Sequence, residues 1–123
     1  EVAQIIGAIP GVLEATVYGV EIPGRDGRAG MAALVVDDDF DINSLPARLA
    51  KGLPDYARPL FLRFRPALET TGTLKQRKVD LVAEGYDPSG IHDPLFAADP
   101  VTAGFVRLDD DLYSRIRTGA VRL

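Results

Sequence analysis

The segment from residue 70 to residue 78 concentrates the residue types that bind anions. A glycine lies between threonines and is followed closely by three basic side chains, the set being Thr71, Gly72, Thr73, Lys75, Arg77 and Lys78. Glycine lets backbone N–H groups approach an anion, and the basic side chains supply positive charge. The segment could therefore hold a phosphate or a carboxylate. The alternative is a polar turn that leads into a helix whose basic side chains face solvent. A P-loop is excluded, because that motif has a lysine after its second glycine and Thr73 follows Gly72 here.

Other polar stretches give weaker signals. Residues 21–30 contain three glycines and two arginines between apolar runs. This suits either a phosphate-binding loop or a flexible hairpin loop, and the hairpin loop is favoured. His92 is the only histidine, so no histidine pair exists that could bind a metal. The acidic runs 37–39 and 109–111 lack the ligand spacing of a calcium loop. We therefore expect no metal site.

Composition and charge restrict the function classes. The chain has 123 residues, 46% hydrophobic and 26% charged, which is typical of one globular domain. Its formal net charge of −4 argues against a nucleic-acid binder, because such proteins need a positive field. The absence of cysteine excludes a disulfide scaffold and a thiolate nucleophile. The longest clean apolar run, Met31–Val36, is far shorter than the ~20 residues of a membrane-spanning helix, so we expect a soluble chain with no transmembrane segment.

Apolar periodicity and turn residues predict an alternation of helices and strands. The predicted elements are a helix ending before Pro10, strands at 12–20 and 31–36, a helix at 45–53, a strand at 60–65, and helices at 78–84 and 109–119. The third strand alternates apolar residues with Arg63 and Arg65, which predicts one solvent-facing side. Prolines and glycines predict that residues 86–100 form an irregular surface segment. This order predicts an α+β domain with a small β-sheet, of about three main strands, covered by helices.

A series of short motifs runs along the chain in a fixed order. They are Val17-Tyr18-Gly19-Val20, Pro23-Gly24, Gly27-Arg28-Ala29-Gly30-Met31-Ala32-Ala33, Leu53-Pro54-Asp55-Tyr56-Ala57-Arg58-Pro59, Phe61-Leu62-Arg63, Thr71-Gly72-Thr73-Leu74-Lys75-Gln76 and Asp93-Pro94-Leu95-Phe96. Together they resemble the C-terminal part of the fatty acid transport protein and very-long-chain acyl-CoA synthetase family. That family belongs to the adenylate-forming, AMP-binding enzymes. These enzymes activate a carboxylic acid with ATP to an acyl-adenylate and then transfer the acyl group to the thiol of CoA.

The resemblance implies a role for the whole chain. Residues 1–123 would form one domain, the C-terminal lid of an ATP-dependent long- or very-long-chain fatty acid:CoA ligase, with a family-specific tail from residue 86 onward. ATP and Mg²⁺ would be bound mainly by a missing N-terminal domain that also binds the fatty acid, and CoA would be the co-substrate. The chain would be a fragment that begins just after the family's hinge, and inactive alone. The full-length protein would be cytoplasmic, or peripheral at a membrane.

The resemblance also implies site residues. In this family the lid carries a lysine to the adenylation site, where a cation reduces the repulsion between the carboxylate and the α-phosphate. The matching residue is Lys75, which follows Thr73 by two residues as in the transport-protein subfamily, whereas the commoner adenylate-forming motif places its lysine directly after the glycine. Lys78 is the alternative. The expected substrate- or phosphate-binding residues are Thr71, Gly72, Thr73 and Arg58, with Arg28 and Arg63 also near phosphates.

Two other interpretations remain open. In the first, the chain is a non-catalytic binding or structural module whose Thr71-Gly72-Thr73 segment docks a partner protein or an acyl carrier. In the second, it comes from a degenerate paralogue that retains the lid only as a structural element. A full-length sequence with an upstream ATP-binding loop and a hinge aspartate would favour the enzyme.

Overall fold

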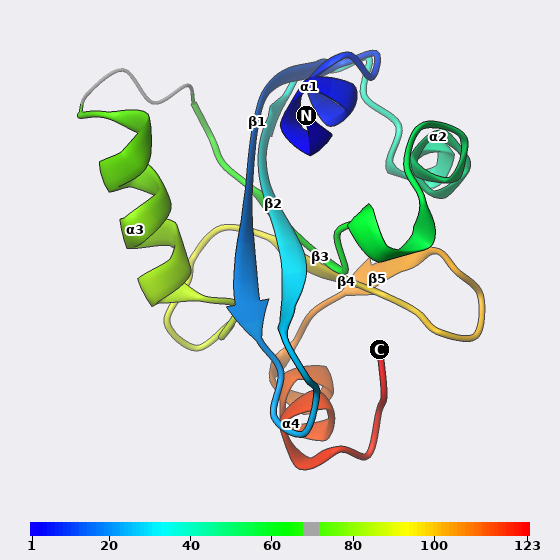
Figure 1. The fold of residues 1–123 in the computed structure, drawn as a ribbon, viewed down its shortest axis with the longest axis vertical. Coiled ribbons are helices and arrows are strands. Elements are labelled where there is room, and N and C mark those ends of the chain that lie inside the picture. Colours follow the sequence, from blue (N-terminus) through cyan, green and yellow to red (C-terminus); the bar gives the residue numbers. More distant parts are fainter. Residues whose placement is uncertain (68–71) are drawn as a thin grey trace.

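The fold is known from a computed structural model that describes residues 1–67 and 72–123 (Figure 1). The helices are α1 (Val2–Gly7), α2 (Leu45–Gly52), α3 (Leu74–Glu84) and α4 (Asp110–Thr118), with short 3₁₀ helices η1 (Ile42–Ser44) and η2 (Asp55–Ala57). The strands are β1 (Val12–Glu21), β2 (Arg28–Val36), β3 (Phe61–Phe64), β4 (Leu95–Ala98) and β5 (Phe105–Arg107).

The strands form one mixed sheet in which the order along the chain is also the order in space. The sheet has five strands in the order β1-β2-β3-β4-β5. β1 and β2 form a long antiparallel hairpin, β2 and β3 are parallel, and β4 and β5 continue antiparallel from β3. A parallel pair needs a crossover connection, and the segment with η1, α2 and η2 supplies it between β2 and β3.

Helices cover both faces of the sheet, and each face has its own hydrophobic core. Alternate residues of a strand point to opposite faces, so Met31 and Ala33 of β2 join one core while Ala32 and Leu34 join the other. The first core includes Leu81 of α3 together with a residue of α4. The second includes residues of α1 and α2. Figure 1 shows α3 on one side of the long β1–β2 pair and α2 on the other.

The α+β class with a helix-covered sheet is confirmed, but the expected strand number is wrong. Residues 86–100 are not wholly an irregular surface segment, since β4 lies within them and pairs with β3 and β5. The prolines at positions 94 and 100 flank this strand and do not interrupt it, so its hydrogen bonds can form. Leu95 and Ala97 are buried in the first core. Strands of three and four residues are too short to give a clear periodic signal.

Two helix boundaries illustrate what local signals determine. α4 forms where predicted: the side chain of Asp109 accepts a hydrogen bond from the N–H of Leu112, and Gly119 ends the helix in the left-handed conformation. α3 begins at Leu74, four residues before the predicted start. None of the helices in the described part of the chain is long and apolar enough to cross a lipid bilayer.

Candidate functional site

The candidate site is the N-terminal end of α3, and two residues fix its backbone. Thr73 is the cap, with φ −91° and ψ 160°, and its Oγ1 accepts a hydrogen bond from the N–H of Gln76 at 3.1 Å. Gly72 before it has φ 74°, in the left-handed region that favours glycine. The threonine-to-glutamine spacing is that of a capping box, a signal that could have located this helix start in the sequence.

Lys75 lies in the first turn of α3 and is exposed to solvent. It makes no hydrogen bond or ion pair with any residue that the structure describes. At 3.6 residues per turn, Lys75 lies about 120° around the helix axis from Leu81, the buried residue of this helix. The side chain therefore extends from a face of α3 that does not pack on the sheet.

The surroundings of Lys75 are electropositive. The first turn of α3 contains no acidic residue, and Lys78 follows one turn later, half-buried. The first N–H groups of a helix have no intrahelical acceptor, and together they carry a partial positive charge at this end. Asp80, farther along the helix, accepts a hydrogen bond from the side-chain amide of Gln76 at 3.1 Å. This helix end can therefore attract an anion even though the chain as a whole has a net charge of −4.

The structure does not bring Arg58 to this end of α3. The Arg58 guanidinium donates to the carbonyl of Leu53 at 2.9 Å and to that of Ala50 at 3.3 Å, and it also pairs with Asp55. These contacts attach Arg58 to the C-terminal end of α2. Because α2 and α3 cover opposite faces of the sheet, the predicted phosphate-binding role of Arg58 would need a surface separate from that of Lys75.

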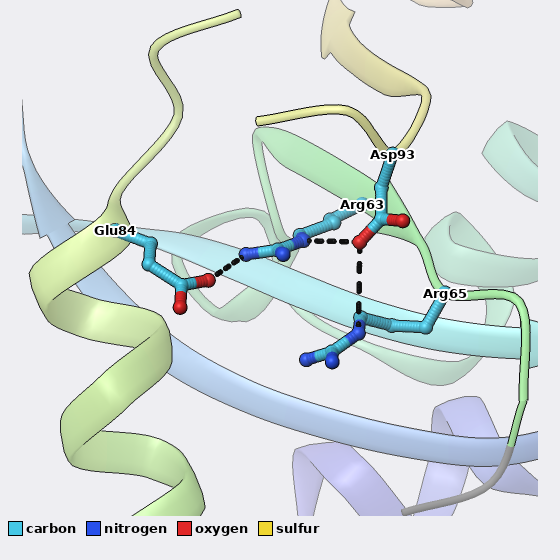
Figure 2. Close-up of polar contacts among 4 residues, drawn as sticks. All are labelled: Arg63, Arg65, Glu84 and Asp93. Carbon is cyan, nitrogen blue, oxygen red and sulfur yellow. Dashed lines mark hydrogen bonds and ion pairs between the residues drawn. The ribbon is translucent and has the colours of Figure 1, made fainter. Parts of the chain in front are cut away.

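The prediction that the third strand has a solvent-facing side at Arg63 is wrong. β3 lies between β2 and β4, and the side chain of Arg63 is only 9% exposed. Arg63 pairs with Glu84 and with Asp93, the latter at 2.9 Å from Nε to Oδ2 (Figure 2). Burial works to lower its pKa, but the hydrogen bonds to the two carboxylates and their negative charges together outweigh that effect and raise it. Arg63 is thus engaged inside this domain.

The remaining predicted residues are distributed as follows. Thr71 lies outside the described residues, so its predicted role stays a prediction. Arg28 is exposed at the start of β2, where its Nη1 donates to the carbonyl of Gly19 at 3.4 Å. Gly72 and Thr73 are exposed, whereas Lys75 belongs to a helix.

Glu84 and Asp93 were missed as partners of Arg63. They lie 21 and 30 positions away from it along the chain, so no local pattern links them. The two carboxylates reach Arg63 only because the fold places the end of α3 and the start of β4 next to β3.

Comparison with known families matches residues 1–75 to the family model for the AMP-binding enzyme C-terminal domain. The chain belongs to this family. The match ends at Lys75, and most of α3, β4, β5 and α4 lie beyond it. No solved structure matches the chain significantly.

Individual relatives match this chain along its whole length. Long-chain fatty acid transport protein 3 of Homo sapiens is 42% identical over 125 aligned residues that include all of this chain and 18% of that protein. Long-chain fatty acid transport protein 6 of Mus musculus is 40% identical over all of this chain and 20% of its own length. The chain thus spans about a fifth of the length of these relatives. Both the domain family and the resemblance to the fatty acid transport proteins are confirmed.

Proposed function

We propose that this chain is the lid of an ATP-dependent long- or very-long-chain fatty acid:CoA ligase and that Lys75 is the residue it delivers to the adenylation site. The observation that carries the proposal is the state of Lys75, which is exposed, has no described hydrogen-bond or ion-pair partner and lies at the positive end of α3. The similarity to long-chain fatty acid transport proteins supports the substrate class. The full-length protein would work in the cytoplasm or at the periphery of a membrane.

The proposed chemistry needs a cation for electrostatic reasons. In the first half-reaction a carboxylate oxygen of the fatty acid attacks the α-phosphorus of ATP, and the bond from that phosphorus to pyrophosphate breaks. Both reactants are anions, so an ammonium group between the carboxylate and the α-phosphate stabilises the charge in the transition state. In the second half-reaction the thiol sulfur of CoA attacks the acyl carbon and AMP leaves. Lys75 has no role in that step.

The chemical groups at the start of α3 also indicate that this site would not bind Mg²⁺ by itself. Mg²⁺ neutralises phosphate charge and prefers carboxylate and water oxygens. The first turn of α3 offers an ammonium group and backbone N–H groups, and it has no carboxylate. ATP-bound Mg²⁺ would therefore be held mainly by the domain that binds ATP, outside this chain, as would the fatty acid. Gly72 and Thr73 would contact a phosphate through their backbone.

The test uses the full-length parent protein, because the proposed role of Lys75 exists only across a domain interface. Lys75→Ala should lower acyl-adenylate formation by roughly 10²-fold, the effect of removing a preorganised charge-stabilising group. The assay is fatty-acid-dependent pyrophosphate release or exchange. Thioester formation from preformed acyl-adenylate and CoA should stay close to the wild-type rate, since this step bypasses the damaged one.

Lys78→Ala is the matched control, because Lys78 is in the same helix and carries the same charge. It should keep adenylation within about twofold, as expected for a partly exposed charge that does not contact the substrate. If Lys78→Ala is the damaging change, Lys78 is the lid lysine. If both variants keep full adenylation, the proposed function of this site is wrong.

The binding-module alternative also has an observation in its favour. Leu74 and Val79 of α3 are 53% and 55% exposed, and apolar side chains on a surface can dock a partner. A docking role would make Leu74→Ser and Val79→Ser more damaging to partner binding than Lys75→Ala. The ligase proposal expects the opposite order for adenylation.

A further inference from the structure

Four charged residues form one ionic network beneath α3, which we call the Arg63 network: Arg63, Arg65, Glu84 and Asp93 (Figure 2). Arg63 contacts a carboxylate oxygen of Glu84 through Nη1 and one of Asp93 through Nε. The same Asp93 oxygen lies 3.6 Å from Nε of Arg65. The side chain of Arg63 is 9% exposed and that of Asp93 is 20% exposed, so water screens their contact only weakly.

The members of the Arg63 network lie at both ends of the segment that carries Lys75. Arg65 directly follows β3, where the chain leaves the sheet toward α3. Glu84 is the last residue of α3. Asp93 lies two residues before β4 and pairs with both arginines. The segment between Arg65 and Glu84 is therefore anchored at its beginning and at its end to the same charge cluster on the sheet.

Apart from this network, α3 has little apolar attachment to the sheet. Leu81 is its buried residue, and Val82 packs against the first core only partly buried. Leu74 at the start of the helix and Val79 at its middle are more than half exposed. The apolar contacts of α3 with the sheet are thus concentrated near its C-terminal end. How that end is fixed therefore contributes to the orientation of the whole helix.

Because α3 is rigid, a change of its tilt at Glu84 would displace Lys75 at the other end. Lys75 and Glu84 are nine residues apart, which at 1.5 Å per residue is about 13 Å along the helix axis. A tilt of about 10° at the Glu84 end would therefore move Lys75 by roughly 2 Å. Misplacing a reacting or charge-stabilising group by about 1 Å can cost on the order of 10²-fold in rate.

We infer that Arg63 is a positioning residue for Lys75: by holding Glu84 and Asp93, it sets the orientation of α3 and hence the place that Lys75 reaches. This inference rests on the proposed function, because it needs Lys75 to act in adenylation. A buried ion pair often adds little net stability and can still specify one arrangement of two elements. The Arg63 network selects the orientation of a helix that apolar packing leaves weakly determined.

The test uses Glu84→Gln in the full-length parent protein. Glu84 is 47% exposed, so the neutral amide is tolerated in the fold, and thermal unfolding monitors this. Adenylation should fall by roughly tenfold as Lys75 loses its position. Thioester formation from preformed acyl-adenylate and CoA should be unchanged, because Lys75 has no role there. A merely structural role would lower both half-reactions together.

Asp80→Asn is the matched control. It removes the same charge from the same helix, but the Asp80 carboxylate bonds to Gln76 within α3 and to none of the Arg63 network. It should leave adenylation within about twofold of wild type. Asp93→Asn, which weakens the network from the other segment, should reproduce the Glu84→Gln effect.

A double variant separates this inference from the proposed function. If Glu84 acts through Lys75, Lys75→Ala with Glu84→Gln should be no slower in adenylation than Lys75→Ala alone. Additive losses would overturn the positioning role. An equal loss in both half-reactions, or no loss in Glu84→Gln while Lys75→Ala is slow, would also overturn it. A Lys75→Ala variant with full activity would instead refute the proposed function.

Discussion

At the scale of single residues, burial decides what a charged or polar side chain does. Arg58 and Arg63 are the same residue type and were both expected near phosphates. The structure attaches Arg58 to the carbonyls at the end of α2 and places Arg63 under α3 between two carboxylates. Lys75 differs from both because it is exposed and makes no described polar contact within this domain. A group that must act on a substrate elsewhere has to be available in this way.

Tyr18 is the residue whose polar group is least well accommodated. Its hydroxyl is buried and has no hydrogen-bond partner among the described residues, and burial raises its pKa to about 12, against the opposing charges of Arg63 and Arg65. An unpaired buried hydroxyl destabilises the folded state. Tyr18→Phe should therefore keep the free energy of unfolding at pH 7 unchanged or raise it by up to about 1 kcal/mol. Urea denaturation measures this.

The raised pKa of Tyr18 also predicts how the free energy of unfolding changes with pH. An unfolded tyrosine ionises near pH 10, whereas folded Tyr18 keeps its proton to about pH 12. The free energy of unfolding is therefore unaffected by Tyr18 ionisation below pH 10, and it falls as the pH rises from 10 to 12, because only the unfolded state loses the proton there. Tyr18→Phe should lose less stability over this range than wild type, whereas the exposed Tyr56→Phe should behave like wild type. A Tyr18→Phe variant destabilised by more than about 1 kcal/mol at pH 7 would show that the hydroxyl makes a stabilising bond.

At the scale of elements, local chemistry predicted the structure where caps and periodicity were strong. The β1–β2 hairpin and α4 follow from alternation, glycines and the Asp109 cap. β4 and β5 could not be predicted, because both are short, β4 depends on pairing with β3, which is distant in sequence, and β5 in turn pairs with β4. For the same reason the charge alternation around Arg63 gave no indication that this arginine is buried. The role of Lys75 was inferred from the family resemblance and stays a prediction, and its position inside a helix was not predicted.

The cap of α3 offers a test at this scale. Thr73→Ala removes the hydroxyl that accepts from the N–H of Gln76 and should lower the free energy of unfolding by about 1 kcal/mol. Thr73→Ser keeps a hydroxyl and should stay close to wild type. Chemical denaturation of the three proteins measures the difference. Equal stability of the alanine and wild-type chains would mean that the cap does not hold α3 in solution.

At the scale of the whole molecule, the chain has a hydrophobic core on each face of its sheet, whereas its candidate site needs chemical groups from outside the chain. Helices cover both faces of a five-stranded sheet, so the chain has what independent folding requires. The candidate site, in contrast, is an exposed helix end with no enclosing wall of described residues. Its chemistry therefore depends on the surface that it meets.

This arrangement predicts the behaviour of the isolated chain. Residues 1–123 produced alone should give the circular dichroism and the cooperative unfolding of a folded α+β domain. They should form no acyl-adenylate from ATP and a long-chain fatty acid, because the candidate site supplies only one of the required groups. Pyrophosphate release dependent on both substrates, above that of a buffer blank, would show that this chain holds a complete active site.

The central claim is that Lys75 enters the adenylation site, and differential amine labelling of the full-length parent protein tests it most directly. The chain has three lysines, Lys51, Lys75 and Lys78, so Lys51 on α2 serves as an internal reference. Labelling would be quantified by mass spectrometry with and without a long-chain fatty acid plus an ATP analogue that has a methylene group between its α- and β-phosphates. The account predicts that Lys75 is strongly protected when both ligands are present, while Lys51 labels at an unchanged rate. Equal labelling of Lys75 in both conditions would contradict the account.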